Sequence, residues 1–452
     1  KMNIIIVGAG KVGRELIERF SKENHDITVI DENAELTDRL TEDYDVMGIC
    51  GNGTICNILR EANVGRADIL IATTAKDEMN MICCMIARKL GAKSCIARVR
   101  NVEYTAQTAF MREEMGISVL VNPEYDAAKE ISRVINFPAA IKIDTFAKGK
   151  LDLAEFKIDA GSKLDGKALW EINKSFSQKF LICAAQRGDD VVIPNGDYVL
   201  KAGDRIHITA EHRELVRFLK EIGLQSQKIK SVMIIGGGTI AYHLAKRLAE
   251  TGIHVTIIEI DEKVCVKLNS LLPKAEIICA DGSDQDVLFE QGIENVDACV
   301  SLTGIDEENI IISLFAKVKG VDKVITKVNK VSLMNILDSI GLDTIISPKT
   351  ITSDIIMRYS RAVQNSEGSH VKTLYKIVDG QAEALEFIAA PEFEGLDIPL
   401  KDLTLKSNLL VAGILRKEAF IIPGGEDVIK ADDRVIIVTA GNILKDLDEI
   451  IK

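Results

Sequence analysis

The sequence predicts an α/β protein that contains two parallel-sheet domains, each followed by a small α+β domain. Three observations lead to this prediction. Short apolar runs alternate with helical patterns, which is typical of parallel sheets whose strands are buried on both faces. A glycine-rich loop follows the first apolar run. The whole pattern then returns 228 to 229 residues later in this chain of 452 residues, so a tandem duplication is expected.

Residues 3–31 carry the strongest functional signal. An apolar run at residues 4–7 leads into a loop containing Gly8, Gly10 and Gly13, and a helical pattern follows. In such a loop the first glycine permits a tight turn, the second lets the backbone approach a pyrophosphate, and the third lets helix and strand pack closely. A second apolar run ends at Asp31, which would accept hydrogen bonds from ribose hydroxyls. This order of elements predicts a Rossmann-like domain whose helix start holds phosphates.

The rest of the first unit continues the alternation of strands and helices. Further strands are expected at residues 46–50, 68–74, 94–99 and 118–121, with helices between them, and the unit closes near Asn122 and Pro123. Strands that alternate with helices form a parallel sheet with right-handed crossovers.

The second unit repeats these features in order. Residues 232–241 repeat the glycine loop with Ala241 at the third glycine, and Glu259 takes the place of Asp31. Residues 281–283 repeat 52–54, residues 297–303 repeat 68–74, and residues 325–328 repeat 96–99. So many aligned positions indicate a duplicated domain.

Short strands and turns replace the helical pattern between the units, from about residue 140 to residue 210, and this texture also recurs. The matched positions are Pro194, Gly196, Lys201, Asp204 and Arg205, which correspond to Pro423, Gly425, Lys430, Asp433 and Arg434. The predicted domains are residues 1–137, 138–225, 229–363 and 364–452.

An amphipathic helix that begins at a proline precedes each small domain. The first is expected at residues 123–136 and the second at residues 348–363. Each helix could pack on its own sheet, or it could cross to a neighbouring large domain.

Composition excludes several functional classes. The net charge of −12 and the pI near 5.2 argue against a nucleic-acid partner, which requires basic surfaces. The first apolar run leads straight into the glycine loop, so no signal peptide is expected, and no apolar run reaches the ~18 residues of a membrane helix. The nine cysteines are expected to be free, buried thiols in a reducing cytoplasm. No metal site and no catalytic constellation are predicted.

The glycine loop, the Gly-Asn-Gly-Thr turn at residues 51–54, the Thr-Thr segment followed by Asp77, Glu78 and Asn80, and the duplication together resemble the TrkA family. These proteins are the regulatory subunits of Trk potassium-uptake systems and contain tandem RCK (regulator of potassium conductance) units. The resemblance implies large domains that bind NAD(H), with ATP or ADP as the other candidates. It further implies a cytoplasmic homo-oligomer, a tetramer, which lies beneath a membrane-embedded potassium-translocating subunit of the TrkH or TrkG type and gates it.

The resemblance also implies two sets of nucleotide-binding residues. The first comprises Gly8, Ala9, Gly10, Lys11 and Val12 for the pyrophosphate, Asp31 for the adenosine ribose, Asn52 and Gly53 beside the adenine, Thr73 and Thr74 along the ribose and phosphates, and Arg98 as a phosphate cation. The second comprises Gly236, Gly237, Gly238, Thr239, Ile240, Glu259, Asp281, Gly282, Thr303 and Lys327. Because Leu302 replaces Thr73 and Lys327 replaces Arg98, the two sites are expected to be unequal, with the first dominant.

Two other functions compete with a regulatory binding module. A nicotinamide-dependent dehydrogenase would need a substrate domain and an acid/base group, and the small duplicated domains offer neither. A purely structural protein would keep the glycine loops as relics.

Overall fold

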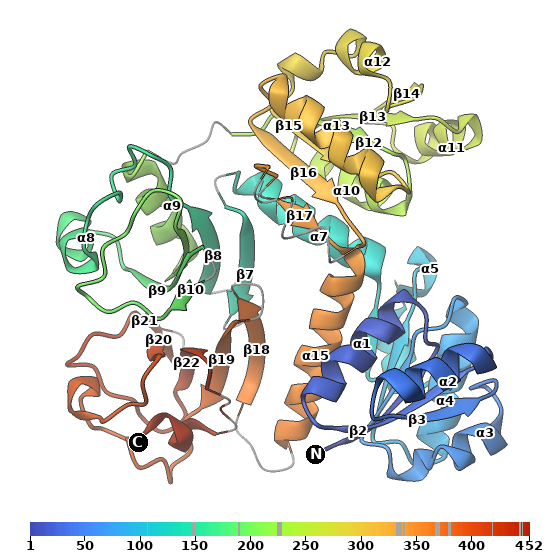
Figure 1. The fold of residues 1–452 in the computed structure, drawn as a ribbon, viewed down its shortest axis with the longest axis horizontal. Coiled ribbons are helices and arrows are strands. Elements are labelled where there is room, and N and C mark those ends of the chain that lie inside the picture. The colour runs from blue at the N-terminus through green and yellow to red at the C-terminus, as the bar shows by residue number, and fades with distance from the viewer. Residues whose placement is uncertain are drawn as a thin grey trace. The chain divides into compact units, whose positions relative to one another are not determined.

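The first glycine loop and its repeat each follow an inner strand of a separate six-stranded sheet in the computed structural model of the chain (Figure 1). The structure describes residues 1–105, 107–138, 140–146, 151–188, 190–223, 228–330, 337, 340–342, 344–366, 371–377, 381–417, 419–442, 444 and 446–452. Contacts among them divide the chain into two compact units. One contains residues 1–132 and 230–363, and the other contains residues 133–229 and 364–452.

The first sheet is parallel, with the strand order β3-β2-β1-β4-β5-β6. Alternate residues of β1 enter different cores: Ile4 and Ile6 face one, and Ile5 and Val7 face the other. Burial on both faces explains the uninterrupted apolar run. The strands are β1 (Asn3–Val7), β2 (Asp26–Asp31), β3 (Met47–Cys50), β4 (Ile69–Ala72), β5 (Ser94–Arg98) and β6 (Val119–Val121). The helices are α1 (Lys11–Lys22), α2 (Ala34–Asp43), α3 (Cys56–Glu61), η1 (Val64–Arg66), α4 (Asp77–Lys89), α5 (Val102–Thr105) and α6 (Thr108–Glu113).

The second sheet repeats this topology in the order β14-β13-β12-β15-β16-β17, and all its pairings are parallel. The predicted pair of Rossmann-like sheets is therefore confirmed. Its strands are β12 (Ser231–Ile235), β13 (His254–Glu259), β14 (Glu276–Cys279), β15 (Ala298–Ser301), β16 (Lys323–Lys327) and β17 (Ile345–Ile346). Its helices are α10 (Thr239–Glu250), α11 (Glu262–Leu271), α12 (Gln285–Glu290), η3 (Ile293–Asn295) and α13 (Asp306–Val318).

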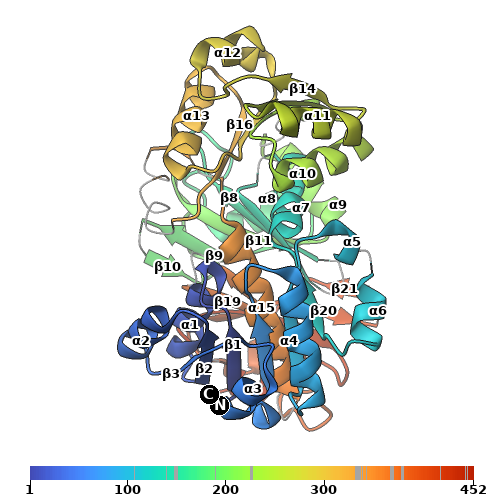
Figure 2. The ribbon, with the colours of Figure 1, turned by 90° about the vertical axis from the view of Figure 1, so that its right-hand side faces the viewer.

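Helix α15 (Pro348–Ser366) belongs to the second half of the sequence but packs on the first sheet (Figure 1 and Figure 2). Ile356 and Met357 are buried in the same core as Ile4 and Ile6. Arg19 of α1 also forms an ion pair with Asp354 at 2.5 Å. The structure thus agrees with the crossing alternative for α15.

Helix α7 (Pro123–Asn136) contacts the second large domain in turn. The ring of Tyr125 lies edge-on to His243 of α10, with 5.4 Å between ring centroids, and Arg247 lies over the Tyr125 ring. The two halves of the chain therefore exchange helix contacts.

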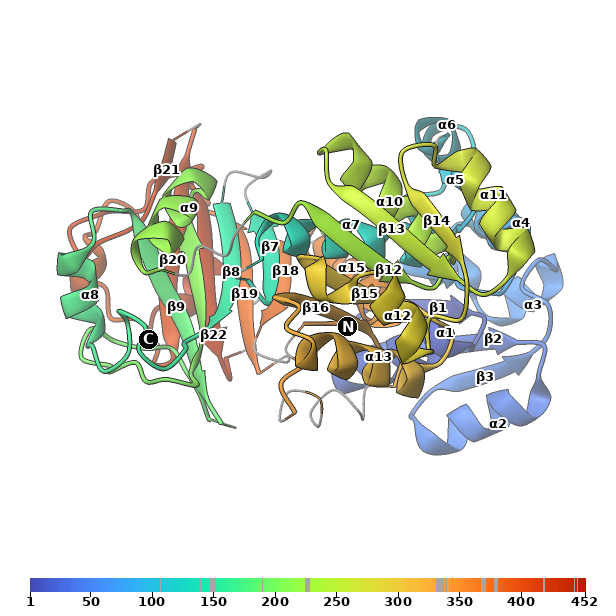
Figure 3. The same cartoon turned by 90° about the horizontal axis from the view of Figure 1, so that it is seen from above.

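The compact unit formed by residues 133–229 and 364–452 contains two antiparallel five-stranded sheets. Their strand orders are β10-β9-β11-β8-β7 and β18-β19-β22-β20-β21. The two sheets lie side by side (Figure 3) and share an apolar core. Across this core the Thr209 hydroxyl donates to the Ala412 carbonyl at 3.1 Å. The first comprises β7 (Lys142–Phe146), β8 (Leu151–Lys157), β9 (Phe180–Arg187), β10 (Asp190–Val192) and β11 (Arg205–Ala210), with α8 (Leu169–Ser175) and α9 (His212–Glu221). The second comprises β18 (Val371–Ile377), β19 (Ala382–Ile388), β20 (Leu409–Arg416), β21 (Ala419–Ile421) and β22 (Arg434–Ala440), with η6 (Leu400–Asp402) and η7 (Leu447–Ile450).

The repeated acids of the small domains have a structural role. Asp204 and Asp433 are almost fully buried, and each pairs with an arginine, Arg187 and Arg416 respectively, at 2.7 Å. Each acid also accepts from a backbone amide, that of Lys201 or Lys430, so it fixes the turn before the last strand.

Among the residues that the structure describes, no helix has the length and apolar character needed to cross a membrane.

Candidate functional site

Each glycine of the first loop has a geometric reason to be glycine. Gly8 has φ of +93°, and a Cβ atom there would lie 2.7 Å from the backbone nitrogen of Thr74. A Cβ atom at Gly13 would lie 2.1 Å from the carbonyl oxygen of Gly8, so helix and strand could not pack as they do. At Gly10 nothing lies within 4 Å of the Cβ position, which leaves room above the backbone for a ligand. The second loop matches at Gly236 (φ +98°) and Gly238.

The acids at the ends of β2 and β13 hold these loops. The Asp31 carboxylate accepts from the amide of Ala9 at 2.7 Å and from that of Asn33 at 3.0 Å, one bond on each oxygen. Glu259 accepts from the amides of Gly237 at 2.6 Å and Asp261 at 2.8 Å in the same way. An ionised carboxylate offers about four acceptor positions, so each acid keeps about two for a ligand.

Thr73 is placed differently from the sequence-based expectation. Its hydroxyl was expected along the ribose and phosphates, but it is buried and donates to the carbonyl oxygen of Gly8 at 2.9 Å. The hydroxyl therefore holds the turn of the glycine loop. Leu302, at the same place in the second domain, cannot make this bond, so the second loop lacks that tie.

Two buried asparagines, Asn80 and Asn309, connect strand ends beside the glycine loops, and neither was predicted as a site residue. Asn80 accepts from the Thr74 amide at 2.8 Å and donates to the carbonyl of Arg98 at 2.8 Å. Asn309 does the same for Thr303 and Lys327, at 2.8 Å and 3.1 Å. Each therefore joins the ends of two neighbouring strands. The signal was available, because both asparagines occupy the same position of the repeated Asp-Glu-x-Asn segment.

The turn after the third strand packs over the first strand in both domains. The Asn52 side chain accepts from the amide of Thr54 at 2.8 Å, and a Cβ atom at Gly53 would lie 2.3 Å from the Val7 side chain. In the second domain Asp281 accepts from the Ser283 amide and hydroxyl, and these bonds lower the pKa of Asp281. Gly282 packs against Ile235 in the same way.

The helix-side ends of the two glycine loops, at Lys11 and Val12 and at Gly238 to Ile240, border one cavity of about 290 Å³, which we call the chamber. Arg98 and Lys327 also line it. The predicted acids Asp31, Glu259 and Asp281 are not among its described lining residues, and neither are Asn52, Gly53, Thr74, Gly282, Thr303 and the remaining loop residues. Four helices begin at it, namely α1, α7, α10 and α15. Its lining residues are Lys11, Val12, Arg98, Pro123, Glu124, Gly238, Thr239, Ile240, Ala241, Leu302, Lys327, Asn329, Pro348 and Lys349. Four cations and one acid line it, so its field favours anions.

The two strand-end cations are partly buried at the chamber. Arg98 donates to the carbonyl of Thr74 at 3.4 Å, and Lys327 donates to the carbonyl of Leu302 at 3.3 Å. Burial lowers the pKa of each, and Glu124 opposes this shift in both. A bound anion would offset the burial cost of these charges.

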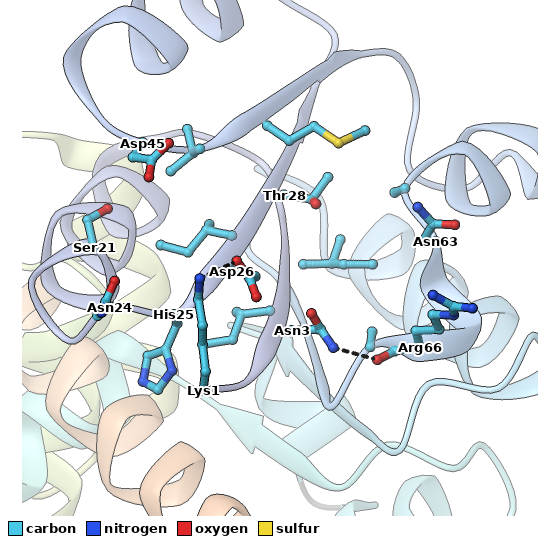
Figure 4. A pocket seen from close by; sticks show the side chains of 17 residues that line it. Lys1, Asn3, Ser21, Asn24, His25, Asp26, Thr28, Asp45, Asn63 and Arg66 are labelled. Atoms are coloured by element: carbon cyan, nitrogen blue, oxygen red, sulfur yellow. Dashed lines mark hydrogen bonds and ion pairs between the residues drawn. The ribbon is translucent and has the colours of Figure 1, made fainter.

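A larger hollow of about 530 Å³ lies at the other end of the first sheet, at the start of β1 and β2 (Figure 4). Its charged groups include Lys1 and Asp26, which pair at 2.7 Å and are both more than half exposed. Ligands of open α/β sheets bind at the carboxyl ends of the strands, so the chamber, despite its smaller volume, is the better candidate site.

The described residues include no group of three His, Cys, Asp or Glu side chains that could hold a metal ion. All nine cysteines are free, but the expectation that they are buried is wrong for Cys50, Cys56 and Cys279, which are exposed. Cys279 ends β14, which lies at the edge of its sheet, so its apolar neighbours in sequence do not cover it.

Comparison with known proteins gives a consistent result. The family model of the TrkA-N domain matches residues 4–123 and 232–348, and that of the TrkA-C domain matches residues 153–223 and 396–452. A Trk system potassium uptake protein TrkA homolog of Archaeoglobus fulgidus is 33% identical over 451 residues, which cover 100% of both chains. The Trk system potassium uptake protein TrkA of Haemophilus influenzae is 31% identical, with 96% of this chain and 95% of that one covered. The solved GsuK channel bound to NAD has the same fold, with a TM-score of 0.65 and 18% identity over 98% of this chain and 77% of that one.

Proposed function

Because this chain belongs to the TrkA family, we propose that it is a nucleotide-binding regulatory subunit, not an enzyme, which gates a membrane potassium transporter of the Trk type. The observation that carries the proposal is the pair of glycine loops whose helix-side ends border one cationic chamber. Two features support the proposal: helix starts and cations suit the binding of phosphates, and the chamber lies at the carboxyl ends of the strands, where open α/β sheets bind ligands.

The proposed ligand is NAD(H), with ATP or ADP as the alternative. At the first site, the backbone from Gly8 to Val12 would hold the pyrophosphate, Asp31 the ribose and Arg98 a phosphate. Asn52 and Gly53 would lie beside the adenine, and the amide of Thr74 would border the ribose and phosphates. The second site would use the matching residues from Gly236 to Ile240, with Glu259, Asp281, Gly282, Thr303 and Lys327.

The proposed partner is a membrane-embedded potassium-translocating subunit, as in the systems from which the relatives take their names. The chain would meet it at the inner face of the membrane as a homo-oligomer, for which we propose a tetramer. Nucleotide binding would change that assembly and so gate transport.

Calorimetric titration of the full chain with NADH, NAD, NADPH, ATP and ADP tests the nucleotide function. We expect saturable binding of at least one of these nucleotides. Gly10→Glu is the informative variant: the site has space for the side chain, but its carboxylate would repel a pyrophosphate. Gly424→Glu, at another glycine with only ordinary contacts at its Cβ position, is the matched control.

The proposal fails if none of these nucleotides binds, or if Gly10→Glu binds them as the wild type does. Potassium uptake by cells that carry the chain and its own transporter tests the regulatory part. There Gly10→Glu should abolish the nucleotide response, and Gly424→Glu should keep it.

A further inference from the structure

The second residue of each exchanged helix lines the chamber, and the two residues have opposite charges. Lys349 follows Pro348 at the start of α15, and Glu124 follows Pro123 at the start of α7. These are corresponding positions of the duplicated chain. The starts of α7 and α15 are therefore equivalent in structure but carry opposite charges at the chamber.

Lys349 lies beside the helix that carries the first glycine loop. Its Nζ atom is 3.5 Å from Oε2 of Glu15 on α1, and both side chains are largely buried. This separation is longer than a normal hydrogen bond, so the ammonium keeps donors for another acceptor. Burial raises the pKa of Glu15, and Lys349 and Arg19 act against this shift.

Glu124 stands at the start of the helix that contacts α10, which carries the second glycine loop. Its neighbour Tyr125 packs on His243, and the Oε2 atom of Glu124 is buried without a hydrogen-bond partner among the described residues. A buried carboxylate oxygen in a phosphate chamber repels an incoming anion. Glu124 interacts with both strand-end cations, Arg98 and Lys327. At the matching position of the exchanged helices, however, the helix beside the second loop begins with an acid and the helix beside the first begins with a base.

We propose that Lys349, supplied by the second half of the chain, is a phosphate-binding residue of the first site, and that Glu124 weakens phosphate binding at the second. The inference rests on the proposed nucleotide function and adds to it a difference in ligand preference between the two sites. The first site takes the ligand with more phosphate charge, and the second discriminates against it. The asymmetry adds to that expected from Lys327 in place of Arg98.

The test compares affinities for AMP, ADP and ATP in the full chain by calorimetry. Removing Lys349 alone would leave the buried Glu15 with Arg19, at 3.7 Å, as its remaining cation, so the reference protein is Glu15→Gln and the test protein is Glu15→Gln with Lys349→Met. We expect the tighter ADP affinity to fall about tenfold, as for loss of one charge-assisted hydrogen bond, and the loss to grow from AMP to ATP. Lys267→Met, at an exposed lysine of α11 outside the described chamber lining, is the control and should leave these affinities unchanged.

Each result separates the two proposals. If the wild-type chain binds no nucleotide, the proposed function fails. If it binds and the Lys349→Met change leaves ADP affinity unaltered, or lowers AMP, ADP and ATP equally, then Lys349 is not a phosphate-binding residue and the inference is overturned. If the Lys349→Met protein does not fold, Glu124→Gln decides. It should strengthen the weaker ADP transition, and an unchanged transition overturns the inference.

Discussion

Replacement of Asp31 is the sharpest test of the first site. Its two carboxylate oxygens already accept from the amides of Ala9 and Asn33, at 2.7 Å and 3.0 Å. The acceptor positions left over suffice for the two hydroxyls of one ribose. Asp31→Ala removes those bonds and also the tie to the loop, whereas Asp31→Asn keeps an oxygen that can accept from Ala9 but removes the charge.

The magnitude follows from the bonds lost. Two hydrogen bonds to a charged group at ~1.5 kcal/mol each amount to about 3 kcal/mol, or roughly a hundredfold in affinity for NADH in Asp31→Ala. Asp31→Asn should lose about tenfold, since neutral bonds are roughly half as strong. It should also narrow the preference for NADH over NADPH, because the negative charge that repels a 2′-phosphate is gone.

Calorimetric titration with NADH and NADPH measures both effects, and Asp38→Asn, at an exposed acid of α2, is the control. An Asp31→Ala protein that binds NADH within about twofold of the wild type would show that the ribose lies elsewhere. Equal losses in the Ala and Asn variants would mean that charge alone matters and that the loop tie does not.

Three further predictions concern stability and thiol chemistry. Ile356→Ala should lower the free energy of unfolding by about 3 kcal/mol and speed hydrogen exchange in β1, although Ile356 lies in the other half of the chain. The control Ile311→Ala, at an exposed position, should change the free energy of unfolding by less than ~0.5 kcal/mol. Equal effects of the two variants would contradict the packing of α15. Burial raises the pKa of Glu15, so the folded state binds the carboxyl proton more tightly than the unfolded state does. The stability of the wild type should therefore fall relative to that of Glu15→Gln as the pH rises above about 4.5. Calorimetric melting of both proteins from pH 4.5 to 7 measures this, and a stability difference that does not change with pH would refute it. A thiol reagent should label the three exposed cysteines of the native protein quickly and the six buried ones only after denaturation, because the reagent cannot reach a buried thiol. Burial also raises the pKa of Cys183 and Cys299 to about 12, which disfavours their reactive thiolates. Rapid labelling of all nine would refute the described core.

The local features of the fold were predictable from the sequence. The run at residues 4–7, the three glycines and the acid at Asp31 each act on close neighbours in one βαβ unit, so their spacing alone indicates the structure. The duplication then supplied an internal comparison that identified the second domain. The predicted α/β class, with two parallel sheets and two small antiparallel sheets, is confirmed because each of its elements is set by local sequence pattern.

Long-range choices were not predictable in the same way. The pattern of α15 shows an apolar face, but both large domains offer an apolar sheet, and only the structure shows that Ile356 enters the first core. The direction of the Thr73 hydroxyl depends on the Gly8 carbonyl, which the fold brings near from a distant part of the chain. The exposure of Cys279 depends on strand order, because the same sequence would be covered in an inner strand.

The position of α15 also constrains the order in which the protein can be made. The first sheet leaves the ribosome more than 200 residues before the helix that covers one of its faces. At about 5–20 residues per second, that interval lasts on the order of ten to fifty seconds. During this time α1 and α2 cover part of that face of the first sheet, but the place of Ile356 and Met357 in its core is empty. We expect the exposed apolar surface to be a target for chaperones and for a second nascent chain. The first large domain therefore reaches its final packing only after α15 has been synthesised, so the domains do not complete their folding one after another in chain order.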